Sequence, residues 1–563
     1  MCGISVIFGK NLVEFKKINQ LVGDLSHRGP DNTTIKKINQ NLIFGHNRLK
    51  IVDLSDKANQ PFVHKNVSLL FNGMIYNFLE LKKEISTQNF NFKTNCDTEV
   101  ILAAYFKWGE KCFSKLTGMF SIVLWDDKKK KLFCVRDRLG IKPLYYTTKD
   151  KNLYVSSELT PLKKITSFKP NNLVISDYIN YSLYENKSNT FFKNIKQIEP
   201  GYIYKFDIDN KFSKFKYWSL FDVIKKKENS LEKKSQNNIK EKIIERIQEI
   251  KKIYSISNVK SAAFLSSGLD SFVLTDFLLE SDKKLKLLLS FGFNSDSKDE
   301  LSQIQKTHKM KKINHKKIRF TFGNFFKNLN EVNYQQESPW GGPNIYFMGE
   351  LLKFAKKKKF KVAYNADGAD EIFGGYKKYL RQLKINSFSV NKSYFNLHID
   401  GTTTDVHDLS HDLFLKRNYE YSKEVVKIPS IHNITNQRYL DIVYNKLPRN
   451  FRFSDRYSMN NSIELRYPFL DHKLLELSFE LNKSNLINNK KNKILLRNLV
   501  KNYKINKKRH INGPQTEWIY RREIFEYLNK IMKKSPIFEG YLDKKKTKNY
   551  INHFYNTRKS NSF

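Results

Sequence analysis

Cys2 is the residue of this chain whose chemistry stands out first, because removal of Met1 alone would leave its thiol beside a free α-amine. A thiol has a pKa of about 8.5 and needs a base to become a strong nucleophile, whereas an α-amine has a pKa of about 7.7 to 8.0. One residue would therefore supply both nucleophile and base, as in enzymes whose N-terminal amine activates its own side chain. Taken alone, the plainer interpretation is an ordinary cysteine after an initiator methionine.

A second group of chemistry-bearing residues follows an apolar run that ends at Leu265. There the small, hydroxylated segment Ser266-Ser267-Gly268-Leu269-Asp270-Ser271 opens a helical pattern. Backbone N–H groups and the dipole at a helix N-terminus favour anions, and serine hydroxyls add hydrogen-bond donors without bulk. The segment could thus cradle a pyrophosphate, although a serine- and glycine-rich turn is commonly only a turn.

The elements that must position Cys2 read as short strands separated by turn signals over the first 205 residues. One helical pattern, residues 98–106, interrupts them, and we expect Asp97 to be its N-cap. Together these features predict a layered α/β sandwich. The strand-like runs are residues 42–44, 67–71, 120–125, 132–135 and 144–146.

From about residue 260 the pattern changes to buried strands followed by helices. Strand-like residues 262–265 precede a helical pattern over 272–279, and 362–364 repeat the strand pattern. Such alternation favours a parallel sheet. The polar, charged stretch 225–242 indicates a connection or the first exposed helix of the next domain. The predicted division is a first domain at 1–210, a connection at 211–240 and a second domain at 241–563.

Lysine and arginine number 101 against 56 aspartate and glutamate residues, a formal net charge of +45. Such an excess raises nucleic acid or an anionic membrane as a partner, because clustered lysines displace counterions from phosphates. The lysines are instead spread along the chain, which is typical of solvated faces and argues against a nucleic-acid partner. No run of about 18 apolar residues offers a membrane span, and the N-terminus lacks the features of a signal peptide. We therefore expect a cytoplasmic protein without a membrane partner.

The cysteines also argue against secretion. Cys2, Cys96, Cys112 and Cys134 all lie in the first quarter of the chain, unlike the cysteines of a secreted disulfide framework. We expect the last three to be small, buried apolar residues.

Six segments of the first 145 residues, taken in order, resemble the glutamine-hydrolysing asparagine synthetase family. They are Cys2-Gly3-Ile4, His27-Arg28-Gly29-Pro30-Asp31, Gly45-His46-Asn47-Arg48-Leu49-Lys50-Ile51-Val52-Asp53, Gln60-Pro61, Phe71-Asn72-Gly73 with Ile75-Tyr76-Asn77, and Arg136-Asp137-Arg138-Leu139-Gly140-Ile141-Lys142-Pro143-Leu144-Tyr145. The resemblance implies a four-layer N-terminal-nucleophile glutaminase fold in which Cys2 attacks glutamine. Asn72, through its side-chain amide, and Gly73, through its backbone N–H, would form the oxyanion hole. Arg48 would clamp the glutamine α-carboxylate, and Asp97 would meet its α-ammonium.

Three later segments carry the resemblance through nearly the whole chain. They are residues 365–376, residues 455–471, and Lys493 with Leu496-Arg497. They imply a parallel-sheet synthetase domain similar to the adenine-nucleotide α-hydrolases. Outside such a match, Glu464 in the second segment would be interpreted as a surface or capping carboxylate.

The resemblance also implies roles in the second site. Asp270 and Asp370 would hold Mg²⁺, because hard oxygen ligands suit a hard cation. Lys493 would stabilise charge on departing pyrophosphate, and Asp367 is the candidate base that deprotonates attacking ammonia. The residues implied to bind ATP are Leu265, Ser266, Ser267, Gly268, Leu269, Asp270, Ser271, Asp370 and Glu371.

The reaction implied by the resemblance is glutamine-dependent asparagine synthesis by an ATP-dependent carbon–nitrogen ligase. The β-carboxylate of aspartate attacks the α-phosphorus of ATP, and ammonia released at Cys2 then converts β-aspartyl-AMP into asparagine and AMP. Because ammonia must arrive unprotonated, an apolar passage between the sites is implied as well. The expected partners are glutamine, aspartate and Mg-ATP, and a homodimer stays open.

Two alternative functions stay open. Ser267 stands where the family more usually has glycine, Asp367 where many members have glutamate, and segment 513–518 also departs from familiar members. A sugar carboxylate of a surface polysaccharide could therefore replace aspartate as the acceptor. A basic nucleic-acid-binding protein is suggested by charge alone and predicts steeply salt-dependent binding. A β-lactam-forming relative is disfavoured, because it has no use for Cys2.

Met74 departs from the family in the first site, because the residue after Asn-Gly is usually a glutamate that helps to hold the substrate ammonium. Asp97 would then carry that charge more nearly alone, and we expect glutaminase activity with a raised KM for glutamine. The variant Met74→Glu should lower the glutamine KM in steady-state assays of glutamate release. An unchanged KM in that variant would contradict the expectation.

Overall fold

The computed structural model describes most of the chain. The described residues are 1–10, 15–86, 90–181, 183–185, 187–230, 235–293, 301, 304, 313–382, 429–430, 432–488, 491–500, 517–518, 520–534, 543, 545–549, 552 and 555. Segment 513–518, which departs from familiar relatives, lies outside this set except for its last two residues.

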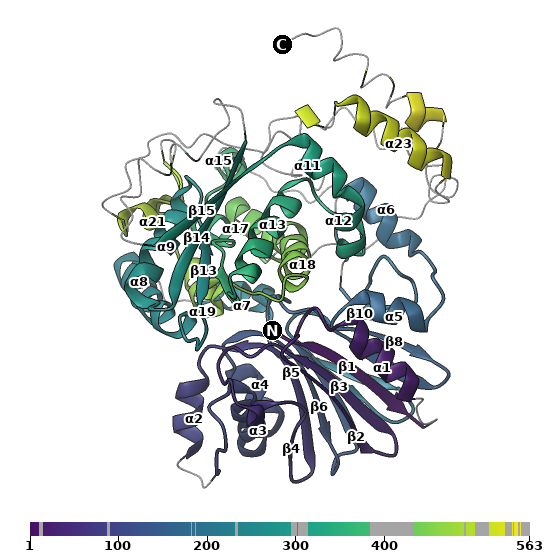
Figure 1. Ribbon diagram of the computed structural model, residues 1–563. Coiled ribbons are helices and arrows are strands. Elements are labelled where there is room, and N and C mark those ends of the chain that lie inside the picture. Colours follow the sequence, from purple (N-terminus) through teal and green to yellow (C-terminus); the bar gives the residue numbers. More distant parts are fainter. Residues whose placement is uncertain are drawn as a thin grey trace.

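The first part of the chain forms two six-stranded antiparallel sheets that pack face to face (Figure 1). The first sheet contains β1 (Gly3–Gly9), β2 (Asn32–Asn39), β3 (Leu42–Arg48), β8 (Tyr145–Lys149), β9 (Asn152–Ser156) and β10 (Lys196–Gln197). The second contains β4 (Phe62–His64), β5 (Val67–Ile75), β6 (Gly118–Asp126), β7 (Lys131–Arg136), β11 (Tyr202–Phe206) and β12 (Phe212–Lys216). Their orders are β10-β8-β9-β1-β3-β2 and β12-β11-β7-β6-β5-β4.

Alternation along the strands explains why the sheets stack. Successive side chains of a strand face opposite sides, so Ile4, Val6 and Phe8 of β1 reach one apolar cluster together with Leu70 and Val123 of the second sheet. Helices cover the outer faces, which gives four layers. The covering helices are α1 (Phe15–Asp24) and α5 (Leu159–Ile165) on the first sheet, and α3 (Asp97–Trp108) with α2 (Phe78–Ser86) beside it on the second.

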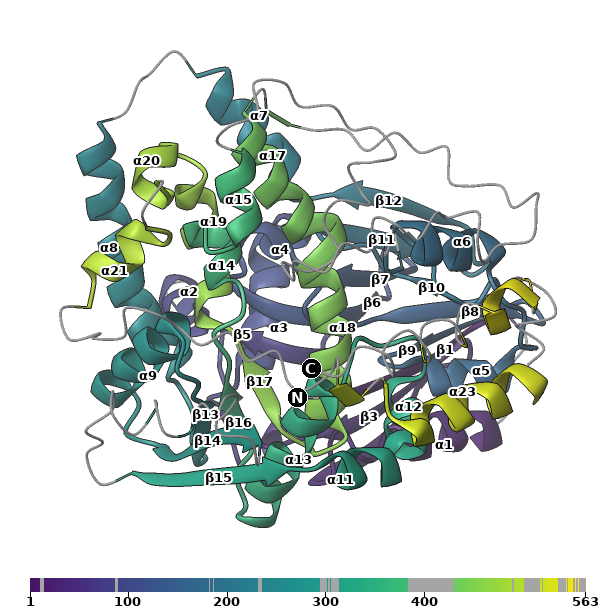
Figure 2. The same cartoon turned by 90° about the horizontal axis from the view of Figure 1, so that it is seen from above.

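The second part of the chain forms a five-stranded parallel sheet surrounded by helices (Figure 2). Its strands are β13 (Ser261–Phe264), β14 (Leu285–Phe293), β15 (Asn314–Phe320), β16 (Val362–Tyr364) and β17 (Glu464–Arg466), in the order β15-β14-β13-β16-β17. Strand β13 leads into α9 (Leu269–Ser281), and β16 leads into α14 (Ala369–Phe373). Because β13 and β16 are parallel neighbours, the segments that follow them meet at one edge of the sheet, where such folds bind ligands.

One long helical run of the second part places side chains against the first part. It consists of α17 (Asn433–Leu440), a π-helical turn (Asp441–Asn445) and α18 (Lys446–Met459). Helix α18 contacts α13 (Asn344–Lys357), α12 (Leu329–Gln336) and β17. Seen from above, it crosses over the strands of the first part (Figure 2).

The fold class predicted from the sequence is confirmed: antiparallel sheets come first and a parallel sheet follows. The five strand-like runs fall on β3, β5, β6, β7 and β8, and β16 matches residues 362–364. The expected connection, 211–240, contains β12, α7 (Leu220–Glu228) and the start of α8 (Gln236–Tyr254). Among the described helices, none is long and apolar enough to cross a membrane.

The expected N-cap of α3 is wrong. The helix begins at Asp97, and the capping position belongs to Cys96, whose side chain makes no capping hydrogen bond. The carboxylate of Asp97 instead accepts a hydrogen bond from the backbone N–H of Ile75 at 3.0 Å. Asp97 therefore faces the neighbouring strand. The expectation for Cys96, Cys112 and Cys134 agrees with the structure, because all three are buried.

Candidate functional site

Cys2 lies at a small cavity at the junction of the two parts of the chain. The cavity measures about 40 Å³, which leaves room for only a few water molecules. Met1 forms part of its wall with a side chain that is fully buried, and the Met1 ammonium lies 3.5 Å from Oε2 of Glu464. Removal of Met1 would therefore free the α-amine of Cys2 and enlarge the cavity in one step.

The two proposed oxyanion donors lie directly beside Cys2. The backbone N–H of Cys2 donates to Oδ1 of Asn72 at 2.9 Å, and Nδ2 of Asn72 donates to Oγ of Ser121 at 3.4 Å. Gly73 has a φ of 154°, and a Cβ there would lie 2.1 Å from the carbonyl oxygen of Met119 on β6. Only glycine fits so close to the neighbouring strand, so the sheet itself requires this residue.

Gln60 and His46 hold the residue that precedes Asn72. Oε1 of Gln60 accepts from the N–H of Phe71 at 2.6 Å, and its Nε2 donates to the Phe71 carbonyl at 3.2 Å. His46 places Nε2 at 3.3 Å from the same carbonyl, and burial lowers the pKa of His46 to about 3. With so low a pKa the imidazole is a weak base near neutral pH, and the contacts of both residues hold the strand in position. The sequence placed them in recognised segments without assigning this role.

Arg48 and Asp97 line the same cavity, as the sequence analysis expected. Nη1 of Arg48 donates to the Ser55 carbonyl and to Oδ1 of Asn59, both at 2.7 Å, which fixes its guanidinium. Burial raises the pKa of Asp97 to about 7, although the hydrogen bond from Ile75 opposes the shift.

Glu464 adds a second carboxylate to this cavity from the far part of the chain. Its Oε1 accepts from Nε of Arg466 at 2.7 Å. Burial alone would raise its pKa, but Arg466 and the terminal ammonium hold the pKa of Glu464 below its usual value. Met74 is buried in the same wall. Sequence analysis assigned Glu464 no part in this cavity, because the other residues of the cavity are hundreds of positions away along the chain.

A second cavity, of about 270 Å³, opens at the carboxyl ends of β13 and β16. It gathers most of the residues expected at an ATP site. These are Leu265, Ser266, Gly268, Asp270, Ser271, Asp367, Asp370 and Glu371. Ser267 and Leu269 are buried and do not line it.

Serine side chains shape the loop before α9. Oγ of Ser271 accepts from the N–H of Ser266 at 3.1 Å and lies 2.8 Å from the Ser266 hydroxyl. Oγ of Ser266 in turn accepts from the N–H of Gly268 at 3.1 Å. These bonds hold a tight turn at the N-terminus of a thirteen-residue helix, a place that favours anions.

Lys493 joins the two carboxylates expected to hold a metal. Its Nζ lies 2.5 Å from Asp270 Oδ2 and 2.5 Å from Asp370 Oδ1, so both acids face one cation position. Although burial opposes it, these two carboxylates raise the pKa of Lys493 above its usual value. A Cβ on Gly375 would lie 1.8 Å from Asp370 and 2.1 Å from Lys493, so glycine leaves the space that the trio needs.

Within the described residues, no group of three or more His, Cys, Asp or Glu side chains could hold a metal ion alone. Mg²⁺ is commonly bound through one or two carboxylates, with substrate phosphates completing its shell. The Asp270 and Asp370 pair fits that pattern.

Asp367 and Glu371 differ in their surroundings. Asp367 is half-buried and accepts from Nδ2 of Asn365 at 3.0 Å. Burial, with help from Asp370 and Asp270, raises the pKa of Asp367 to about 7. Glu371 is fully buried, accepts from the Tyr376 hydroxyl at 2.7 Å and has its pKa raised to about 8, mainly by burial. Asp367 is thus the better placed to exchange a proton near neutral pH.

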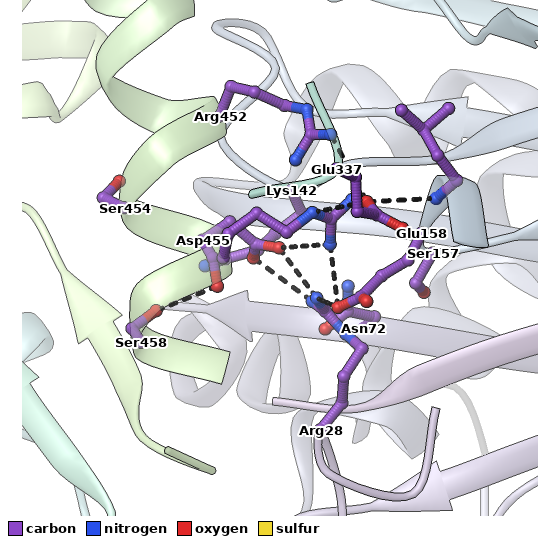
Figure 3. Close-up of polar contacts among 12 residues, drawn as sticks. Arg28, Asn72, Lys142, Ser157, Glu158, Glu337, Arg452, Ser454, Asp455 and Ser458 are labelled. Carbon is purple, nitrogen blue, oxygen red and sulfur yellow. Dashed lines mark hydrogen bonds and ion pairs between the residues drawn. The ribbon is translucent and has the colours of Figure 1, made fainter. Parts of the chain in front are cut away.

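A buried charge network links the region around Cys2 to helix α18 (Figure 3). Nη1 of Arg28, a fully buried side chain, donates to Glu158 at 2.6 Å and to Asp455 on α18 at 2.7 Å. Nε of the same arginine donates to the carbonyl of Cys2 at 3.1 Å. Although burial opposes it, Arg28 keeps the pKa of Asp455 below its ordinary value. Helix α18 is therefore linked to the backbone of Cys2 through the side chain of Arg28.

Further ion pairs extend this network across the junction. Arg456 of α18 lies 2.7 Å from Glu158 and 2.8 Å from Glu337, and Arg452 lies 3.3 Å from Glu337. Strand β17 makes a second link, because Glu464 lines the first cavity while the Arg466 carbonyl accepts from the N–H of Asn365 in the second at 2.9 Å. The structure thus brings the predicted residues together as two clusters that share one interface.

Two family models match the chain. A glutamine amidotransferase domain covers residues 1–218, and asparagine synthase covers residues 243–562. Asparagine synthetase [glutamine-hydrolyzing] 1 of Bacillus subtilis is 26% identical over 97% of this chain and 92% of its own length. The third such enzyme of Bacillus subtilis is 28% identical over 84% of this chain and 80% of its own. A putative asparagine synthetase 2 of Methanocaldococcus jannaschii is 30% identical, over 69% and 78% respectively.

The raised pKa of Asp97 predicts how the KM for glutamine depends on pH. A ligand ammonium binds the carboxylate and not the neutral acid, so the acid form should bind glutamine more weakly. The glutamine KM should therefore fall as the pH rises through about 7, the value that burial sets for Asp97. Steady-state glutamate release measured between pH 6 and 8.5 checks this. In Asp97→Asn the KM should be high and independent of pH in that window, and a pH-dependent KM that persists in this variant would contradict the assignment.

Proposed function

Because the chain belongs to the glutamine-hydrolysing asparagine synthetase family, we propose that it transfers ammonia from glutamine to the side-chain carboxylate of aspartate at the expense of ATP. One observation carries the proposal. A single interface joins a Cys2–Asn72–Gly73 cluster to a cavity lined by a serine loop and by two carboxylates, Asp270 and Asp370, which Lys493 bridges.

In the first step, the α-amine of Cys2 takes the thiol proton after Met1 has been removed, and the thiolate attacks the amide carbon of glutamine. Nδ2 of Asn72 and the N–H of Gly73 donate to the oxyanion that develops. The α-ammonium then returns the proton to the amide nitrogen, so collapse of this intermediate expels ammonia and leaves a thioester on Cys2, which water hydrolyses to glutamate. The Asn72 Oδ1 contact with the Cys2 nitrogen supports this arrangement, because it orients the amine beside its own thiol.

Three charged groups would hold the α-carbon end of glutamine. Arg48, whose guanidinium is already fixed by neighbouring carbonyls, would bind the carboxylate. Asp97 and Glu464 would share the ammonium, which would take the place beside Glu464 that the Met1 nitrogen occupies. Glu464 would then compensate in part for the carboxylate that Met74 lacks.

In the second step, the acceptor carboxylate attacks the α-phosphorus of ATP, and pyrophosphate leaves. The loop from Ser266 to Ser271 would bind phosphate oxygens through its N–H groups and hydroxyls. Asp270 and Asp370 would hold Mg²⁺, which when bound neutralises triphosphate charge. Lys493, which lies beside both carboxylates, would contact the departing pyrophosphate. Attack of ammonia on the adenylate carbonyl then yields the amide and AMP, with Asp367 accepting the proton that nitrogen loses.

Ammonia would cross between the sites along the interface. Strand β17 supports this route, because Glu464 lines the first cavity and Arg466, two positions later, accepts a hydrogen bond from Asn365 of the second cavity. Enclosure matters because ammonia that equilibrates with water at neutral pH is mostly ammonium, which cannot attack an adenylate.

An alternative acceptor has one observation in its favour. A protein of Gibberella zeae named amidase chry2 is 28% identical over 67% of this chain, so similar chains do not all carry the synthetase name. In this second candidate function, both sites keep their chemistry and another carboxylate replaces aspartate.

The proposal predicts that a substitution can separate glutamine hydrolysis from ATP-dependent amide formation. Wild-type protein given aspartate, glutamine and Mg-ATP should yield asparagine and AMP, measured by mass spectrometry. Cys2→Ala should lose this activity with glutamine by at least two orders of magnitude, because the nucleophile is gone, yet retain it with ammonium chloride. Loss of both activities in a folded Cys2→Ala protein would contradict the two-site mechanism. Glutamine-dependent AMP release with a mixture of carboxylates, but not with aspartate, would instead select the alternative acceptor.

A further inference from the structure

Asn365 lines the second cavity, although neither step of the proposed reaction gives it a part. It comes directly after β16, and its backbone N–H donates to the carbonyl of Arg466 on the neighbouring strand β17 at 2.9 Å. Its side chain is buried. The residue therefore continues the pairing of the two strands, and its side chain starts from a fixed backbone.

The turn that follows Asn365 is also fixed. Gly368 has a φ of 94°, in the left-handed region that favours glycine, and it is the capping residue of α14. A Cβ there would lie 2.2 Å from Cδ2 of Leu470, so this leucine packs directly on the turn. Asp367 thus projects from a backbone that is held on both sides, and its carboxylate moves chiefly by rotations of its own side chain.

One hydrogen bond limits those rotations. Nδ2 of Asn365 donates to Oδ2 of Asp367 at 3.0 Å, and Oδ1 accepts no hydrogen bond from the described part of the chain. Asp270 and Asp370 repel the ionised carboxylate of Asp367, because like charges disfavour one another. The amide of Asn365 therefore holds the carboxylate against that repulsion.

A neutral donor in this place suits a base better than a cation would. A lysine or arginine beside Asp367 would stabilise the negative charge strongly and lower the pKa of the carboxyl, which weakens it as a base. The amide of Asn365 holds the same oxygen without a net charge, and the pKa of Asp367 stands at about 7, raised mainly by burial. Such a group exchanges protons readily near neutral pH.

The lengths of the two side chains are matched to each other. The amide and the carboxylate are already in contact at 3.0 Å, so a longer acid at position 367 would reach into the place of the amide. A shorter residue at position 365 would leave that place empty, and the short side chain of Asp367 would lose its hold.

From these contacts we propose that Asn365 is a positioning residue for amide formation, an inference that rests on the proposed function. Its side-chain amide holds Oδ2 of Asp367 and leaves Oδ1 to take the proton. As the ammonia nitrogen bonds to the carbonyl carbon of the adenylate, it gives one proton to Oδ1, and AMP leaves with the electron pair of the broken C–O bond. Asn365 acts through Asp367 and takes no proton itself.

Asn365→Ala removes the amide and tests the proposal step by step. With ammonium chloride, aspartate and saturating Mg-ATP, the kcat of asparagine formation, measured by mass spectrometry, should fall at least about tenfold, because a misplaced base loses much of its effect. Adenylation does not use the base. Aspartate-dependent exchange of labelled pyrophosphate into ATP, measured without a nitrogen source, should therefore fall less than about threefold.

Asn461→Ala is the matched control, because it removes an amide that donates to the backbone carbonyls of Gly349 and Tyr457. This variant should stay within about twofold of the wild type in both assays, as is usual for a substitution away from the reacting groups.

A second substitution shows whether the two residues act as a pair. Asp367→Glu alone forces a longer carboxylate against the Asn365 amide and should slow asparagine formation at least about fivefold. In the double variant, Asn365→Ala with Asp367→Glu, the added methylene occupies the vacated space, so asparagine should form faster than in either single variant. Two independent packing defects would instead multiply their effects.

Circular dichroism identifies folded variants, and Asn365→Leu, which keeps the volume without the donor, replaces Asn365→Ala in the first test if that protein fails to fold. Equal losses in both assays, an unchanged rate of asparagine formation in the folded variant, or a double variant slower than both single variants would each overturn the proposal. Wild-type protein that forms no amide from ammonium would instead contradict the proposed function itself.

Discussion

The buried guanidinium of Arg28 is the contact on which the rest of the architecture depends. It binds Cys2 through a carbonyl, Glu158 within the first part of the chain and Asp455 in the second. Burying one such charge is costly unless every partner is present, and removal of one partner from a buried pair typically costs about 3–5 kcal/mol. Arg28 therefore has all of its charged partners only when the two parts of the chain pack against each other. That requirement holds the two candidate sites in one fixed relation.

Some residues of the segments that resemble the family hold the backbone in place and take no part in the proposed chemistry. The Asp137 carboxylate accepts backbone N–H groups of Phe120, Leu139, Ile141 and Lys142 at 2.9–3.1 Å. Arg136 donates to the carbonyls of Lys142, Gly140 and Ile198 at 2.7–2.9 Å. This loop shapes the interface but lines neither of the two candidate-site cavities. The β6 backbone likewise excludes a Cβ at Gly73, a residue that lines the same cavity as Cys2.

The sequence predicted the features that depend on local residue patterns. Alternating apolar residues located the strands, the serine loop located the helix start beneath the second cavity, and the fold class followed from the change of pattern near residue 260. It could not supply contacts between distant residues. Arg28 and Asp455 are separated by 427 positions, and Glu464 reaches a cavity built from the first hundred residues. Asp97 was displaced from its expected capping role because a long-range partner, the N–H of Ile75, competes for its carboxylate. Pro448 did carry a readable local signal, since a proline inside a helical stretch disturbs the preceding turn.

In the proposed mechanism the Arg28–Asp455 contact couples glutamine hydrolysis to amide formation. The ratio of glutamate to amide product tests this coupling most directly. Wild-type protein with glutamine, acceptor and Mg-ATP should form glutamate and amide in equimolar amounts. In Asp455→Asn, which removes the charge that docks α18 on Arg28, glutamate should exceed amide severalfold while ammonium-driven amide synthesis continues. Equimolar products from a folded Asp455→Asn protein would contradict the account.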